Sequence, residues 1–124
     1  MIYNNIEYKI KFYRNSKNGK SPVEDYINSL DRKAKNKVSK YIEFLQLNNG
    51  VLDEPYSRHI KDKIRELRVD FSNKRHRIFY FAFIDKNIIL LHAFLKKTPK
   101  TPVREIKTAK DNYVDVINNP KLYE

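Results

Sequence analysis

The stretch KIRELRVDFSNKRHRIFYFAFIDKNIILLHAFL, residues 63–95, decides the fold. It contains three segments of strand character, Lys63 to Phe71, Arg77 to Ile84 and Asn87 to Leu95, with turn-prone residues between them. Because the connections are short, neighbouring strands are expected to run antiparallel. Ile88 to Leu91 are apolar on both faces, which predicts central strands that are covered on both sides.

Upstream, residues 8–13 alternate lysines with apolar side chains, which predicts a first strand. Ser21, Pro22 and Glu24 have the spacing of a capping box, so a short helix is expected from about Pro22 to Leu30. Asp31 is a suitable cap for a second helix, which should end at the left-handed stop Asn48-Asn49-Gly50. The apolar stripe of this second helix is Ala34, Val38, Tyr41, Ile42 and Leu45.

Downstream, Pro99 and Pro102 end the last strand, and an amphipathic helix is expected from about Pro102 to Asn118, with a short tail around Pro120. Its apolar positions are Ile106, Ala109, Tyr113 and Ile117. The pattern predicts one α+β domain over residues 1–124, with an antiparallel four-stranded sheet, an N-terminal helical hairpin and a C-terminal helix.

The composition favours an anionic partner. With 26 Lys and Arg against 15 Asp and Glu the formal charge is +11, and the self-repulsion is relieved when an anion such as nucleic acid or an acidic protein binds. The chain has no cysteine, so an ordinary hydrophobic core must hold the fold. The first residues lack an apolar run, so we expect no signal peptide, no membrane anchor and a cytoplasmic location.

Metal and nucleotide-triphosphate chemistry are not expected. The three histidines, His59, His76 and His92, lie far apart in the sequence without metal-ligand spacing, and His59 and His76 are expected at the surface. Only two glycines are present, so there is no phosphate-cradling loop. We therefore predict no cofactor and no metal.

The predicted strands also carry a concentration of cations. Alternation predicts that Lys61, Lys63 and Arg65 share one face of a strand, and that His92, Phe94 and Lys96 share one face of the last strand. A plainer interpretation is a solvated sheet edge whose charges prevent aggregation. The cations between residues 58 and 77 are Arg58, Lys61, Lys63, Arg65, Arg68, Lys74, Arg75 and Arg77.

Such a surface can cleave RNA without a metal. A base removes the proton of the 2′-hydroxyl, which attacks the adjacent phosphodiester, while cations stabilise the developing charge and an acid protonates the leaving 5′-oxygen. DNA lacks this hydroxyl and should be spared.

Three motifs together resemble one protein family. They are Ile64 to Val69 with its E-L-R core, His76 to Phe81, and Leu90 to Pro102 with its K-K-T-P-K-T-P ending. The sequence resembles the RelE/ParE superfamily of bacterial toxins, in its HigB-like, phage-derived branch, from Tyr8 to about Tyr113. His76 stands where that family usually has tyrosine.

The resemblance implies the toxin of a type II toxin–antitoxin system, a ribosome-dependent, metal-independent endoribonuclease that cuts mRNA and is inhibited by a HigA-like, helix-turn-helix antitoxin. It implies phosphate clamps at Arg68 and Arg77 and charge stabilisation by Lys96 or Lys97. The general acid or base stays open between His92, Tyr80 and a lysine at position 61 or 63. Expected to bind the flanking RNA are Lys61, Lys63, Arg65 and Arg75.

Two other functions fit the same sequence. One is a gyrase-directed, ParE-like toxin without nuclease activity, and the other is a non-catalytic RNA-binding module. Structural roles are the alternative for these residues: Arg68 could pair with Glu66 or Asp70 across the sheet, Tyr80 could belong to the core, and Lys97 could cap the strand end.

Overall fold

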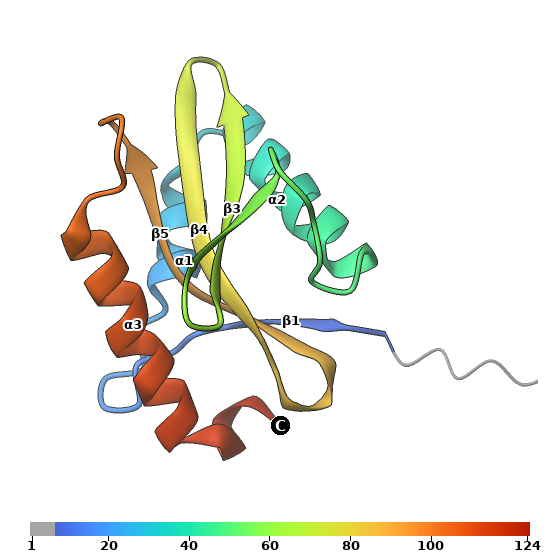
Figure 1. Cartoon of the computed structure of the whole chain (residues 1–124), viewed down its shortest axis with the longest axis vertical. Coiled ribbons are helices and arrows are strands. Elements are labelled where there is room, and N and C mark those ends of the chain that lie inside the picture. The colour runs from blue at the N-terminus through green and yellow to red at the C-terminus, as the bar shows by residue number, and fades with distance from the viewer. Residues whose placement is uncertain (1–6) are drawn as a thin grey trace, which may run out of the picture.

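Three long antiparallel strands form the centre of the structure, as residues 63–95 predict. The computed structural model describes residues 7–124, apart from the side chains of residues 83 and 84. In chain order the elements are β1 (Lys9–Phe12), α1 (Pro22–Ser29), α2 (Arg32–Leu47), β2 (Ser57–Lys61), β3 (Ile64–Phe71), β4 (Lys74–Phe83), η1 (Ile84–Lys86), β5 (Asn87–Lys96), α3 (Val103–Asn118) and η2 (Pro120–Tyr123). Figure 1 shows their arrangement.

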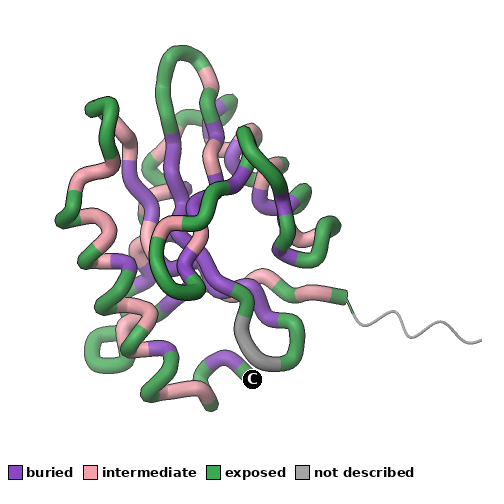
Figure 2. Tube along the Cα trace, viewed as in Figure 1, coloured by how far each residue is buried: buried purple, intermediate pink, exposed green. Residues whose placement is uncertain are grey.

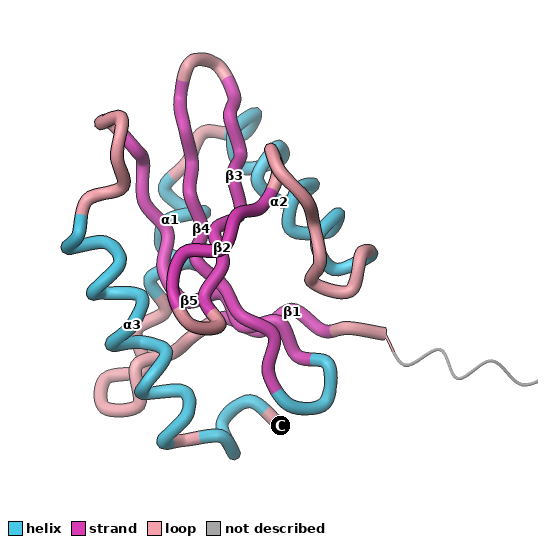
Figure 3. The backbone as a smooth tube through the Cα atoms, in the orientation of Figure 1, coloured by secondary structure: helices cyan, strands magenta, loops and turns pink. Residues whose placement is uncertain are grey.

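The sheet has five strands and is mixed, so the prediction of four antiparallel strands is wrong. Its order is β1-β5-β4-β3-β2, with β1 parallel to β5 and the other neighbours antiparallel. β1 can run parallel because the long helical hairpin that follows it carries the chain across the sheet. The sequence of β2, SRHIK, has one apolar residue and no alternation. Its pairing with β3 (Figure 3) therefore rests on backbone hydrogen bonds that the side-chain pattern did not reveal.

Two hydrophobic cores lie on the two faces of the sheet. Helices α1 and α2 cover one face, where their buried side chains pack with Leu67, Val69, Ile78 and Tyr80. Helix α3 covers part of the other face, over Phe79, Phe81 and Leu91 and their neighbours. Burial follows this arrangement in Figure 2, where the central strands are buried and the β3–β4 hairpin tip is exposed. The tip extends beyond both cores.

The local signals for helix ends were largely correct. Asp31 caps α2 by accepting a hydrogen bond from the Ala34 backbone at 2.8 Å, and Asn49 and Gly50 adopt the left-handed conformation after it. The capping box does not form, because the Ser21 side chain is buried and makes no capping bond to α1. Helix α3 buries Val116 in place of Ile117, which is exposed.

The β3–β4 connection is tighter than expected, whereas the β4–β5 connection is one residue longer than the predicted Asp85-Lys86 turn, because η1 begins at Ile84. Ser72 and Asn73 both have positive φ, at 53° and 62°, the combination that a two-residue hairpin turn requires. Strand β4 therefore begins at Lys74, three residues before the predicted start. His76 falls within it and is buried, with Nδ1 2.7 Å from the Tyr26 hydroxyl, so its predicted surface position is wrong.

Asp115 joins the two ends of the described chain. Its carboxylate accepts hydrogen bonds from the Tyr13 hydroxyl at 2.7 Å, the Ser16 hydroxyl at 2.6 Å and the Asn119 amide at 3.0 Å. Burial alone raises the pKa of Asp115, but the hydrogen bonds from Ser16, Tyr13 and Asn119 outweigh it, and the pKa is lowered. A carboxylate with a lowered folded-state pKa stabilises the fold above its unfolded pKa and loses that effect as pH falls through the folded value.

We predict that Asp115→Ala lowers the free energy of unfolding by about 1–2 kcal/mol at pH 7, because four donors, the Ser16 backbone N–H among them, lose a charged acceptor. The difference from wild type should shrink below about pH 3.9, the ordinary pKa of aspartate. Urea denaturation at several pH values measures both. The control Asp111→Ala removes an exposed pair with Lys107 and should cost less than about 0.5 kcal/mol; equal losses for the two variants would contradict the role of Asp115.

Candidate functional site

The register of the sheet aligns charged residues on the face that α3 only partly covers. Arg68 of β3 lies opposite Arg77 of β4, and Asp70 lies opposite Arg75. Arg75 in turn lies opposite Lys96 of β5. Residues paired in this way project from the same face, so charged residues of three strands meet there. On the other side of β3, Arg58 of β2 lies opposite Glu66. We name Arg58, Arg68, Arg75, Arg77 and Lys96 the cation cluster.

A buried carboxylate lies inside the cation cluster. The Glu66 side chain is 1% exposed. Its Oε1 accepts a hydrogen bond from Arg68 Nε at 3.1 Å and lies 3.9 Å from Arg77 Nε. Its Oε2 accepts a hydrogen bond from the Thr101 hydroxyl at 3.4 Å. Glu66 therefore holds two opposed arginines and ties them to the loop before α3.

The two arginines have different access to solvent. The Arg77 side chain is 5% exposed, and its Nη1 also donates to Asp70 Oδ1 at 2.6 Å and to the His76 carbonyl at 3.1 Å. The Arg68 side chain is 21% exposed. Arg68 can thus reach a ligand, whereas Arg77 is held inside the sheet face and can act on a ligand only through its neighbours.

Lys96 lies near the same groups. Burial lowers its pKa, and Arg77, Arg68 and Arg58 lower it further, while Glu66 opposes them. The net shift is downward, so Lys96 releases its proton at a lower pH than an ordinary lysine. An amine in such surroundings can exchange a proton with a bound substrate.

His92 borders the cation cluster on the side of α3. Its Nε2 lies 3.3 Å from Glu105 Oε1, its ring stacks on Phe94 with centroids 5.8 Å apart, and its Nδ1 is buried. Both nitrogens thus face protein groups. His92 is therefore held between Glu105 and Phe94 at the edge of the cluster.

A cleft opens beside the cluster at the hairpin tip. It has a volume of about 530 Å³, and its lining includes Lys74, Arg75, Lys96 and Lys97. The cluster itself contains five cations and, on the same face, the two carboxylates of Glu66 and Asp70. The excess of positive charge along this cleft is suited to a polyanion.

The structure brings together only some of the predicted residues. Arg68, Arg77, Lys96 and Arg75 meet in the cation cluster, with Lys97 and His92 at its border. Tyr80 does not meet them, because it is buried in the core under α1 and α2, 2.6 Å from the Ser57 hydroxyl.

The predicted alignment of three basic residues on one strand is wrong. Lys61 ends β2, Asp62 and Lys63 form a turn, and Arg65 lies on the opposite face from the cluster. There Arg65 donates to the Ser57 hydroxyl at 3.1 Å. Lys61 and Lys63 are exposed at the turn, where the reversal of the chain ends the alternation that the prediction assumed.

Two acids of the site, Glu66 and Glu105, were not predicted to belong to it. Glu66 was recognised as part of E-L-R and as a possible structural partner of Arg68, with which it shares a face, but not as a member of the site. No sequence signal pointed to Glu105, because its approach to His92 depends on how α3 folds back onto the sheet.

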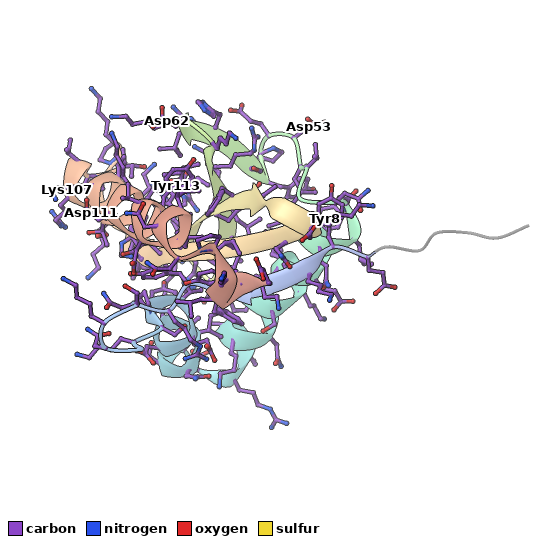
Figure 4. All side chains as sticks on the ribbon, turned by 90° about the horizontal axis from the view of Figure 1, so that it is seen from below. Tyr8, Asp53, Asp62, Lys107, Asp111 and Tyr113 are labelled. Carbon is purple, nitrogen blue, oxygen red and sulfur yellow. The ribbon has the colours of Figure 1, made fainter. Side chains whose placement is uncertain are left out.

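Farther along α3, Lys107 and Asp111 form an ion pair at 2.9 Å on the outer side of the helix, and the Tyr113 ring packs on Phe81 (Figure 4).

We predict that Glu66→Gln lowers the free energy of unfolding by about 3 kcal/mol, because two arginines lose their shared buried charge partner. Chemical denaturation of wild type and variant measures the loss. Asp70→Asn is the matched control, since Asp70 is 66% exposed although it also pairs with Arg77, and it should cost under about 1 kcal/mol. A smaller loss for Glu66→Gln than for Asp70→Asn would show that Glu66 does not organise the cluster.

Residues 25–114 of the chain match the model of a family described as phage-derived protein Gp49-like (DUF891), and no curated protein matches the chain. Among residues 7–124, no group of acids and histidines could hold a metal ion. No helix in that part of the chain is long and apolar enough to cross a membrane. Because the matched residues are well over half of the 124, the chain belongs to the Gp49-like family, a family of RelE/HigB-like toxins of toxin–antitoxin systems.

Proposed function

We propose that the protein is the HigB-like toxin of a type II toxin–antitoxin system and cleaves mRNA on the translating ribosome without a metal. The family implies an antitoxin partner, and we take it to be HigA-like. The observation that supports cleavage is the cation cluster, where Lys96, whose pKa is lowered by burial and by Arg77, Arg68 and Arg58, lines an open basic cleft, and where Arg68 is partly exposed.

The cluster can supply the groups that cleavage needs. The neutral amine of Lys96 takes the proton of the 2′-hydroxyl, and the 2′-oxygen attacks the phosphorus. Arg68 stabilises the charge on the pentacoordinate phosphate. The ammonium of Lys97, which lines the same cleft, gives a proton to the leaving 5′-oxygen. The products are a 2′,3′-cyclic phosphate and a 5′-hydroxyl.

The other residues have supporting roles. Arg77, which is buried against Glu66 and Asp70, positions Arg68. Arg75 and Arg58 are exposed and bind the flanking phosphates. Lys61 and Lys63 lie at the neighbouring turn and contact mRNA or ribosomal RNA farther from the scissile bond.

We predict that Arg68→Ala or Lys96→Ala slows cleavage of mRNA on programmed ribosomes by about 100-fold or more, because each removes a group used in the transition state. Mapping of mRNA 5′ ends over time measures the rate. Lys110→Ala, an exposed cation on α3, is the matched control and should leave the rate unchanged. An mRNA with a 2′-deoxy nucleotide at the cut should resist the wild type.

Two results would overturn this proposal. Growth arrest with intact mRNA and altered plasmid supercoiling would favour the gyrase-directed toxin. Salt-dependent RNA binding without any cleaved product on translating ribosomes would favour a non-catalytic RNA-binding module.

The pH dependence provides a separate prediction. Since the neutral amine is the active form, the single-turnover cleavage rate should rise with pH and level off below the ordinary lysine pKa of about 10.4. Lys96→Arg keeps the positive charge but does not lose its proton, so its rate should stay low and lack this rise. A wild-type rate that falls as pH increases would contradict the role of Lys96 as base.

A further inference from the structure

A second functional surface lies at the C-terminal end of α2, away from the cation cluster. It consists of Tyr41, Phe44 and Leu47 of α2 and Tyr56 of the following loop, which we name the α2 patch. Phe44 is 42% exposed, Leu47 72% and Tyr56 43%. The rings of Tyr41 and Phe44 both contact that of Tyr56, with centroids 6.2 Å and 5.7 Å apart. The three rings thus form one cluster, and Leu47 is exposed one helical turn beyond Phe44.

The core accounts for only part of the α2 patch, because Tyr41 packs against it whereas Phe44, Leu47 and Tyr56 are exposed. Helix α2 already buries a different stripe against the sheet: Ala34, Val38, Ile42 and Leu45. Helix α2 packs on one face of the sheet (Figure 1), and the strand register places the cation cluster on the other face. The α2 patch is therefore a second apolar side of the helix, and it is not part of the proposed catalytic face. Contiguous exposed apolar side chains of this kind mark interaction sites.

The geometry of the rings favours a protein over RNA as the partner. Both contacts are edge-to-face, at interplanar angles of 60° and 86°, so the rings shield one another instead of forming an open stacking platform for bases. Leu47, the most exposed member, offers aliphatic surface that suits apolar side chains.

The charge around the α2 patch specifies the partner further. Helix α2 contains five cations, Arg32, Lys33, Lys35, Lys37 and Lys40, and one acid, Glu43, and the loop before Tyr56 adds two exposed acids, Asp53 and Glu54, so cations remain in excess. Lys37 lies 5.8 Å from the centre of the Tyr41 ring, and Lys40 precedes Phe44 by one helical turn. A second copy of this chain, itself at +11, would bring like charges together. An acidic segment would neutralise them.

We propose that the α2 patch binds an acidic amphipathic helix of the cognate antitoxin. Its apolar side chains pack on Phe44, Leu47 and Tyr56, and its carboxylates pair with Lys37 and Lys40. The inference depends on the proposed function only for the identity of the partner, so binding can be tested without measuring nuclease activity.

The experiment uses the product of the reading frame adjacent to the toxin gene as the probe. Its affinity is measured by biolayer interferometry for the full-length wild type and for the double variants Phe44→Ser/Leu47→Ser and Lys37→Glu/Lys40→Glu. The control is Leu122→Ser, since Leu122 is 61% exposed and lies outside the α2 patch. Growth arrest upon induction, with and without the antitoxin, is recorded for each variant, and thermal melting shows that each is folded.

We expect both double variants to bind the antitoxin at least tenfold more weakly and to escape its rescue, while still arresting growth. The lysine variant should also show a weaker salt dependence of binding. Leu122→Ser should behave as wild type. If the nuclease proposal is wrong but the α2 patch proposal is right, mRNA stays intact and the binding results are unchanged.

Several outcomes would overturn the proposal. The first is that the wild-type chain does not bind the probe. The second is that the folded double variants bind the probe as tightly as the wild type does. Loss of growth arrest with full antitoxin binding would show that the α2 patch meets the ribosome instead. A wild-type dimer that the Phe44→Ser/Leu47→Ser change dissociates would assign the patch to a second copy of the chain.

Discussion

The buried carboxylate of Glu66 is the interaction on which the proposed site depends. The register of β3 and β4 sets Arg68 directly opposite Arg77, and like charges in this position repel each other. Glu66 Oε1 lies 3.1 Å from Arg68 Nε and 3.9 Å from Arg77 Nε. Its negative charge offsets the repulsion between the two arginines, so both can occupy opposed positions in the sheet. Because a single carboxylate cannot neutralise every nearby cation, the cation cluster remains electropositive, which is the condition that a phosphate ligand needs.

The depth of each cation sets what it can do. Arg77 is enclosed by Glu66, Asp70 and the His76 carbonyl, so its positive charge is neutralised by protein groups and is not available to a ligand. Arg68 shares Glu66 but reaches solvent. Lys96 is partly buried among arginines, and this lowers its pKa. Burial, with the neighbouring arginines adding to it, thus increases the fraction of Lys96 that is neutral at moderate pH, the form that the proposed base requires.

Much of this arrangement could be predicted from the sequence, and the failures have physical causes. Alternation placed Arg68 with Glu66 and Lys96 with His92 correctly, since side chains in a regular strand have a period of two. It failed across Asp62 and Lys63, where the chain reverses, and for β2, whose pairing depends on the backbone. For Tyr80 the sequence did not decide between the core and the site, because β4 is apolar on both faces; the structure buries its ring under α1 and α2. The approach of Glu105 to His92 depends on the packing of α3, which no local pattern encodes.

A backbone hydrogen bond connects the α2 patch to the strand that carries Arg68. Tyr56 belongs to the α2 patch, yet its carbonyl accepts a hydrogen bond from the Arg68 backbone at 2.8 Å. A partner that packs on the Tyr56 ring therefore acts one hydrogen bond away from the strand that carries Arg68. Since Glu66 and Arg68 lie on that strand, displacement of Tyr56 would alter the spacing of the cation cluster. An antitoxin on α2 could in this way weaken the proposed catalytic site from the opposite face, without covering it.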